Sequence, residues 1–272
     1  MTNHTQLTDT HALSLHRARA TTDGMFLQES AAREVKDRLR LVNRAFTDVA
    51  IVTPYPSFWK EHFPDAHIVH DDATIDLKVG AHDLVIHALG LHWSNDLVGQ
   101  LIQCRRSLRP DGLLIAALLG GQTLQELRRC LGQAEIELSG GLSPRIAPMA
   151  EIRDLGALLQ RAGLALPVAD SLTLPVEYRD AFHLMHDLRG MGETNAMTER
   201  QRHTPPKELF AKTNDLYADA FATDANRIAA TFEMVFLTGW SPDPGQQKPL
   251  RPGSAKHRLA EALRVPEVPL SD

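Results

Sequence analysis

The chain has 272 residues, a formal net charge of −5 at pH 7, 43% hydrophobic residues and two cysteines. The acidic balance excludes a general polyanion binder, because affinity for nucleic acid rests largely on clustered Lys and Arg that neutralise phosphates. The length fits one large α/β domain or two small ones.

The N-terminal segment, residues 1–47, is predicted to be helical. Its main signal is the spacing of Val35, Leu39 and Phe46, which predicts a helix over residues 28–46 with one face on a sheet. Three strands are predicted to follow, and a short helix containing Trp59 separates the first two. The predicted strands are residues 49–52, a short strand within 65–72, and 82–91, the last with the near-continuous apolar run of a central parallel strand.

The middle of the chain continues the alternation of helix and strand. A helix over residues 96–108, capped by Ser94 or Asn95, leads through a turn at 109–112 to a strand at 113–119. This order predicts a doubly wound parallel sheet in a domain of residues 48–240.

The pattern changes after Gly120, where helices replace the regular alternation. The predicted elements are helices at 123–138 and 149–163 with the loop 139–148 between them, late strands at 166–178 and 230–240, a helical insertion at about 180–225, and a tail at 241–272 that contains Pro, Gly and Lys.

A series of sequence phrases runs through the middle and late parts of the chain. Residues 82–121 read HDLVIHALGLHWSNDLVGQLIQCRRSLRPDGLLIAALLGG, and GGLSPRIAP, LLQRAG, DLRGMGETNA, TFEMVFLTGW and QQKPLRPGSA follow in order. The set resembles the class I S-adenosylmethionine-dependent methyltransferase superfamily, in the branch of mitochondrial complex I assembly factor 5 and its bacterial homologues. The methyltransferase of early biotin synthesis is a more distant relative.

The resemblance implies a Rossmann-like class I methyltransferase fold with a seven-stranded sheet and a late antiparallel strand at 230–240. It implies a site at the carboxyl ends of the parallel strands, as is general for open α/β sheets. It also implies S-adenosylmethionine as the cofactor and a protein as the substrate. In this branch the implied activity is arginine hydroxylation on a subunit of the respiratory NADH dehydrogenase.

The turn after the first strand departs from the family pattern. Residues 53–56, Thr-Pro-Tyr-Pro, replace the glycines, and the two prolines lack N–H donors and fix φ. We expect Tyr55 or Trp59 to fill part of this corner. S-adenosylmethionine is then expected to bind weakly or not at all, and the alternative is a chain without a cofactor.

The spacing of the first strands is a second departure. From Val49 to Asp83 is 83 − 49 = 34 positions, whereas one βαβ unit takes about 30 residues. We therefore expect a reduced N-terminal half that lacks one strand and helix, with at most two strands between Asp48 and His82.

The candidate site residues lie at strand ends or in loops. His92 could orient substrate or move protons, Glu193 could accept a forked guanidinium donor, and Arg145 lies in a loop that covers the site in the family. We expect these three to be catalytic and to surround one cleft. The cofactor-binding candidates are Thr53, Asp71, Asp72, His87 and Leu89, and the substrate-binding candidates are Trp93 and Asn195.

Each candidate also has a plainer interpretation. Asp71 and Asp72 could lie in a solvated turn, His92 could be packed against backbone, and Trp93 could fasten the helix that follows it. His70 and Asp72 have a spacing seen in iron sites, but this spacing is common by chance, so no metal site is predicted.

Three functions remain open at this level. They are a methyltransferase that uses S-adenosylmethionine, an arginine hydroxylase of the complex I assembly type, and a non-catalytic binding module. Cys104 and Cys130 have no metal or redox spacing, which favours a reducing, cytoplasmic setting. No transmembrane segment is predicted, because the longest apolar run, residues 113–119, is too short to span a bilayer.

Overall fold

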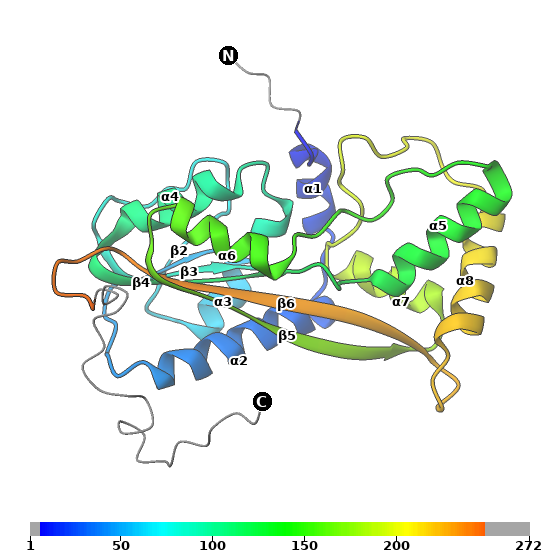
Figure 1. Cartoon of the computed structure of the whole chain (residues 1–272). Helices are drawn as coiled ribbons and strands as arrows, with labels where there is room; N and C mark the ends of the chain where they lie inside the picture. Colours follow the sequence, from blue (N-terminus) through cyan, green and yellow to red (C-terminus); the bar gives the residue numbers. More distant parts are fainter. Residues whose placement is uncertain (1–5, 248–272) are drawn as a thin grey trace, which may run out of the picture. The chain divides into compact units, whose positions relative to one another are not determined.

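A single mixed sheet organises the chain. The computed structural model describes residues 6–247 (Figure 1). In this part of the chain six strands form the sheet, in the order β2-β1-β3-β4-β6-β5. β1 to β4 are parallel, and β6 is antiparallel to β4 and to β5. The strands are β1 (Val49–Val52), β2 (His67–Val69), β3 (His82–Ala88), β4 (Leu108–Leu119), β5 (Ala165–Tyr178) and β6 (Ile228–Trp240).

The predicted centre of the sheet is confirmed. Val49 pairs with Leu84 and Ala88 pairs with Ala117 in parallel register, while Ala117 pairs with Phe236 in antiparallel register. All seven residues of β3 are buried. A strand buried on both faces requires apolar residues at successive positions, which explains the continuous apolar run.

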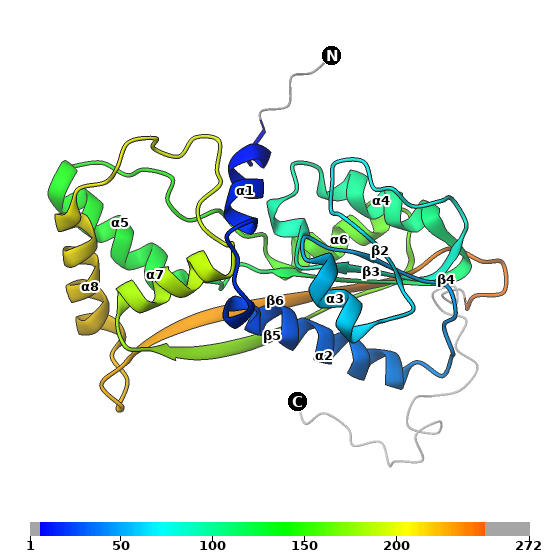
Figure 2. The ribbon, with the colours of Figure 1, turned by 180° about the vertical axis from the view of Figure 1, so that it is seen from behind.

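Helices cover both faces of the sheet, as Figures 1 and 2 show from opposite sides. Val85 and Leu114 point to the face covered by α4 and α6, whereas Ile86 and Ile115 point to the face covered by α2 and α3. α5, α7 and α8 gather near the far ends of β5 and β6. The helices are α1 (Thr10–Arg17), α2 (Phe26–Leu41), α3 (Pro56–His62), α4 (Leu97–Ser107), α5 (Gln125–Ser139), α6 (Ile152–Arg161), α7 (Ala181–Gly190) and α8 (Lys207–Phe221).

The N-terminal half is reduced, as predicted. Between β1 and β3 the chain forms only the seven-residue α3 and the three-residue β2. The sheet of the described residues therefore has six strands where the family resemblance implies seven. Residues 70–81 reach β3 without a helix or strand, and this irregular segment borders the candidate site.

Three local predictions are wrong. The turn predicted at 109–112 is an irregularity within β4. The next pair after His82 with Leu108 is Leu84 with Leu113, so the register advances two positions in β3 and five in β4. The helix predicted to reach Phe46 ends at Leu41. Further along, the backbone N–H groups of Thr47 and Asp48 donate hydrogen bonds to the Asp83 carboxylate. The cap of α4 is Asp96.

The structure describes only the first residues of the predicted tail. Residues 241–247 belong to the described chain, and residues 248–272 lie outside it. The tail predicted at 241–272 and the last eight residues of the phrase QQKPLRPGSA therefore stay predictions.

Candidate functional site

A cavity of about 570 Å³ lies at the carboxyl ends of β1, β2 and β3. We call it the cofactor-side cavity. Pro54 borders it after β1, residues 70–73 after β2, and Gly90 after β3, while α1 contributes a wall that includes Arg17. This is the edge at which open α/β sheets bind ligands. The structure therefore has a cavity at the edge of the sheet where the site was predicted.

The turn after β1 has no free backbone donor. The Thr53 N–H donates to the Val69 carbonyl at 3.0 Å, and the Tyr55 N–H donates to the Thr53 hydroxyl at 3.2 Å. Pro54 and Pro56 have no N–H at all. This turn therefore offers no backbone N–H group to the carboxylate of S-adenosylmethionine.

The expected filling of this corner by Tyr55 or Trp59 stays a prediction. Neither Tyr55 nor Trp59 lines the cofactor-side cavity. The Tyr55 hydroxyl donates to the Met191 carbonyl at 2.6 Å, and burial raises its pKa. The Trp59 indole is buried in the core and donates to Gln28 at 2.9 Å. Neither ring therefore takes part in the wall of the cavity.

Asp71 is already engaged by a basic residue. Its carboxylate lies 3.0 and 3.1 Å from Nη1 of Arg17, and both side chains are largely buried. The same carboxylate packs against Gly90, where an added Cβ would lie 2.3 Å from Oδ2. The neighbouring Asp72 is exposed at the cavity wall. Of the two predicted acids, Asp72 is thus the one with a carboxylate open to solvent.

His87 and Leu89 lie in different places. His87 is buried in β3 beside the cofactor-side cavity, and its Nε2 lies 3.2 Å from Oε1 of Gln100. Burial lowers the pKa of His87 to about 4, so its ring is neutral at pH 7. Leu89 has a φ of 48°, an uncommon value for a branched residue. Its side chain does not line this cavity but faces the His92 side.

Three residues form a buried polar cluster next to the cavity. Oε2 of Glu193 lies 3.1 Å from Nε2 of His92 and accepts a 2.6 Å hydrogen bond from the Trp93 indole. Burial opposes ionisation of Glu193, but the interactions with His92, Arg17 and Trp93 hold its pKa below the ordinary value. Glu193 is therefore a carboxylate at neutral pH. The predicted proximity of His92 and Glu193 is confirmed.

A second cavity of about 380 Å³ opens on the other side of this cluster. We call it the apolar cavity. Trp93 lines both cavities, and Glu193 lines the apolar one. The rest of its wall is mostly apolar and includes Leu127, Met185 and Phe232. A carboxylate in such a wall is suited to a ligand with an apolar body and a polar, donor-bearing end.

Arg145 and Asn195 also line the apolar cavity, but both are engaged in structural contacts. Arg145 donates to Glu135 at 2.6 Å, and Asn195 donates to the Pro144 carbonyl at 2.8 Å. Of the three predicted catalytic residues, Arg145 and Glu193 thus line one cavity, and His92 contacts Glu193 without lining that cavity. The Arg145 charge, however, is balanced by Glu135 and not directed at Glu193.

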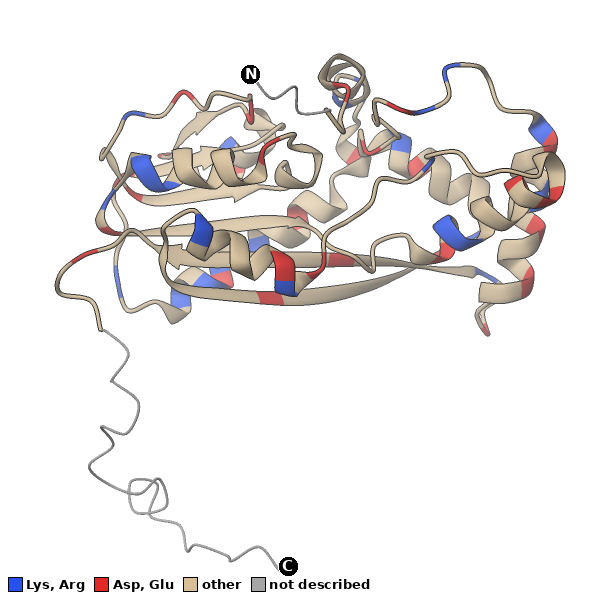
Figure 3. Ribbon diagram, turned by 45° about the horizontal axis from the view of Figure 1, so that its top comes forward, with Lys and Arg blue, Asp and Glu red and all other residues tan. Residues whose placement is uncertain are grey.

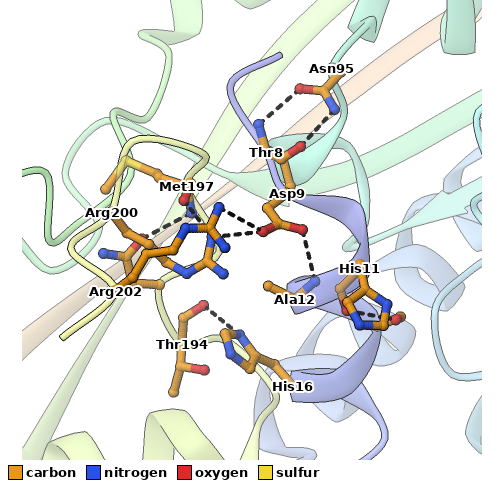
Figure 4. Close-up of polar contacts among 12 residues, drawn as sticks. Thr8, Asp9, His11, Ala12, His16, Asn95, Thr194, Met197, Arg200 and Arg202 are labelled. Carbon is orange, nitrogen blue, oxygen red and sulfur yellow. Dashed lines mark hydrogen bonds and ion pairs between the residues drawn. The ribbon is translucent and has the colours of Figure 1, made fainter. Parts of the chain in front are cut away.

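The N-terminal helix is fastened to the segment that carries Glu193. Figure 4 shows the Asp9 carboxylate capping α1 through Ala12 and accepting hydrogen bonds from Arg200 at 3.0 Å and Arg202 at 3.4 Å. His16 contacts the Thr194 carbonyl at 3.3 Å. These contacts hold α1, and therefore Arg17, over the cofactor-side cavity.

The described residues show no dominant charge of one sign. Lys and Arg alternate with Asp and Glu along the helices in Figure 3. No helix of residues 6–247 is long and apolar enough to cross a membrane. In the same residues, no three His, Cys, Asp or Glu side chains gather in a geometry for a metal ion.

Comparison with known proteins identifies relatives of two kinds. The chain is 42% identical over 180 residues to "Arginine-hydroxylase NDUFAF5, mitochondrial" of Dictyostelium discoideum, which covers 66% of this chain and 41% of that protein. It is 33% identical over 239 residues to the Danio rerio protein of the same name, covering 88% and 72%. It is 30% identical to "Putative methyltransferase RP459" of Rickettsia prowazekii (strain Madrid E), covering 59% and 72%.

Other comparisons give weaker likenesses. A solved structure of a putative methyltransferase from Bacillus halodurans aligns with a TM-score of 0.48 at 11% identity, covering 76% of this chain and 98% of that one. No protein-family model matches the chain. The Danio rerio protein is 33% identical to the chain over an alignment that covers 88% of the chain and 72% of that protein. The chain therefore belongs to the NDUFAF5 family of class I methyltransferase-like proteins.

Proposed function

We propose that the chain is a methyltransferase-like protein of the complex I assembly type that binds an arginine side chain of a protein substrate at Glu193. The observation that carries the proposal is the Glu193 carboxylate in the wall of the apolar cavity, on a side chain that is only 9% exposed. The relatives' name describes them as arginine hydroxylases. Arginine is therefore the side chain that we propose for this site.

The chemistry of the site supports this choice. A guanidinium group is always charged and presents forked donors that match a carboxylate. Both hydrogen bonds that Glu193 accepts within the described residues end on Oε2, so Oε1 is available to a substrate. The methylene stem of arginine would lie against apolar wall residues such as Met185 and Phe232.

His92 and Trp93 position the carboxylate in this proposal. The backbone N–H of Leu119 faces Nδ1 of His92 at 3.5 Å, which leaves Nε2 to carry the ring proton toward Glu193. The Trp93 indole is a donor only. Both groups therefore stabilise the ionised form of Glu193, which is the form that attracts a guanidinium.

Methyl transfer to the same side chain is the second candidate. It is favoured by the cofactor-side cavity, which shares the Trp93 wall with the apolar cavity. The partner that we propose is a subunit of the respiratory NADH dehydrogenase, and the proposed location is the cytoplasm, where the buried free thiols Cys104 and Cys130 stay reduced. Mass spectrometry of a reacted substrate separates the candidates, because one adds an oxygen atom and the other a methyl group.

Replacing Glu193 with glutamine is expected to weaken arginine binding. The probes are acetyl-Gly-Arg-Gly amide and the same peptide with citrulline, a neutral isostere of arginine. Charged hydrogen bonds are worth about 1.5–3 kcal/mol, so we expect Glu193→Gln to weaken the arginine peptide by about 10- to 100-fold in calorimetric titration. The weak binding of the citrulline peptide should change little.

The matched control is Glu208→Gln, which removes an exposed carboxylate from the first turn of α8. It should bind the arginine peptide as the unmodified protein does. Circular dichroism melts show whether each variant is folded. Equal affinity of the unmodified protein for the arginine and citrulline peptides would contradict the proposal.

A further inference from the structure

A third cavity, of about 240 Å³, has no Asp or Glu of the described residues in its wall. We call it the basic cavity. Its basic lining residues are His16, Arg145, Arg200 and His203, and the rest of the wall consists of Ser, Thr, Asn, Gln and Pro residues. A ligand in this cavity therefore meets positive charge, hydroxyl groups and amides, but no carboxylate.

The arginines around the basic cavity outnumber the carboxylates that pair with them. Asp9 accepts hydrogen bonds from Arg200 at 3.0 Å and from Arg202 at 3.4 Å, as Figure 4 shows. Glu135 pairs with Arg145 at 2.6 Å. Three guanidinium groups thus share two carboxylates. Because guanidinium groups stay protonated, this part of the surface keeps an unbalanced positive charge.

Arg200 has donors left for a ligand. Its side chain donates to Asp9 and to the Met197 carbonyl, and both hydrogen bonds start from Nη1. Within residues 6–247, Nε and Nη2 make no hydrogen bond, and neither is buried without a partner, so solvent reaches both. His203 lines the same cavity and is exposed. The basic cavity can therefore bind an anion without breaking the ion pair between Arg200 and Asp9.

The basic cavity shares a wall with the apolar cavity. Arg145, Thr194 and Asn195 line both, and Thr194 directly follows Glu193 in the chain. An extended peptide advances about 3.3–3.6 Å per residue. A peptide whose arginine reaches Glu193 therefore brings residues one to three positions away to the basic cavity.

We propose that the basic cavity selects protein substrates that carry Asp or Glu within three residues of the arginine. The proposal rests on the proposed binding of arginine at Glu193 and adds a second element to the recognised sequence. Guanidinium groups bind carboxylates through charge-assisted hydrogen bonds, and no acidic wall residue repels them. A basic residue at the same position of the substrate would be repelled, so the cavity also rejects wrong sequences.

The test scans an acidic residue through a neutral peptide. The peptide is an arginine with three glycines on each side, and glutamate replaces each glycine in turn; its partner has glutamine at the same position. Calorimetric titration of the full chain at about 0.05 M salt should show a preference for glutamate of about 5- to 10-fold at one position or more. The preference should fall to about twofold or less at about 1 M salt, because salt screens partly exposed charges.

The decisive variant is His203→Glu, which places a carboxylate in the wall of the basic cavity. The preference for glutamate over glutamine should fall to about twofold or less, because like charges repel. The control is His186→Glu, which makes the same change at an exposed residue of α7 that lines none of the three cavities. It should keep the full preference. Thermal melts check that both variants fold.

Three outcomes overturn the proposal. Glutamate could give no preference at any position, His203→Glu could retain the preference, or inorganic phosphate could bind as tightly as the best glutamate peptide, which would make the basic cavity a site for free anions. Citrulline versions of the peptides separate the two proposals. A preference for arginine over citrulline without one for glutamate refutes the basic cavity alone, whereas the reverse result refutes the Glu193 proposal alone.

Discussion

Replacing Trp59 with alanine is expected to lower the free energy of unfolding by about 3–5 kcal/mol. Trp59 is fully buried in the core beneath β1, and its ring stacks on Phe63 with centroids 5.9 Å apart. Truncation removes these contacts and leaves a cavity. It also leaves Oε1 of Gln28 without the 2.9 Å hydrogen bond from the indole. Urea denaturation monitored by circular dichroism measures the change.

Two further variants make this result specific. Trp59→Phe keeps an aromatic ring but leaves Gln28 unpaired, so its loss should be smaller, about 1–3 kcal/mol. Ser57→Ala changes an exposed residue of the same helix and should stay within about 0.5 kcal/mol of the unmodified protein. If Trp59→Ala were as stable as Ser57→Ala, the indole would not make the core contacts with Phe63 and Gln28 that the structure shows.

The second large effect is a loss of stability in acid that depends on His87. Its pKa is about 4 in the folded chain, lowered by burial from 6.5. The unfolded chain therefore takes up a proton before the folded chain does, and stability is lost as the pH falls from 6.5 through 4. Each pH unit in this window removes about 1.4 kcal/mol, to a total of about 3 kcal/mol. The groups that act on His87 are Asp71, Arg17, His92 and Gln100.

Comparison with His87→Gln isolates this contribution. Glutamine does not titrate, and its amide can donate to Gln100 as Nε2 of His87 does. Urea unfolding at pH 7 and pH 4.5 should show about 2–3 kcal/mol less acid sensitivity in His87→Gln than in the unmodified protein. His203→Gln, an exposed substitution, should keep the full sensitivity. Identical pH dependence in His87→Gln and the unmodified protein would mean that His87 is not buried as a neutral ring.

The sheet could be predicted because its signals are local. Continuous apolar runs mark β3 and β4. The small number of residues between Val49 and Asp83 indicates that the N-terminal half of the fold is reduced. Open α/β sheets bind ligands at the carboxyl ends of their strands, and this principle correctly predicted that His92 and Glu193 lie close together, although they are 101 positions apart. The order of the elements and the pattern of apolar residues are enough to predict the strands and the edge of the sheet where a site lies.

The contacts of the candidate site could not be predicted in the same way. Arg17 meets Asp71 across 54 positions, and no periodicity or spacing records such a pair. The ion pair between Arg145 and Glu135 likewise depends on the direction of a side chain in a loop, which the sequence does not record. The irregularity in β4 was missed because Pro110 and Gly112 are typical of a turn, whereas the strand pairing resumes around them.

The position of Trp93 has a thermodynamic consequence. Its ring is a wall of both cavities, and its N–H is held by Glu193. A ligand in the cofactor-side cavity that shifts this ring changes the free energy of binding at Glu193. By reciprocity, a ligand at Glu193 then changes affinity in the cofactor-side cavity by the same factor. A substrate side chain could therefore set how long a second molecule stays bound, without touching it.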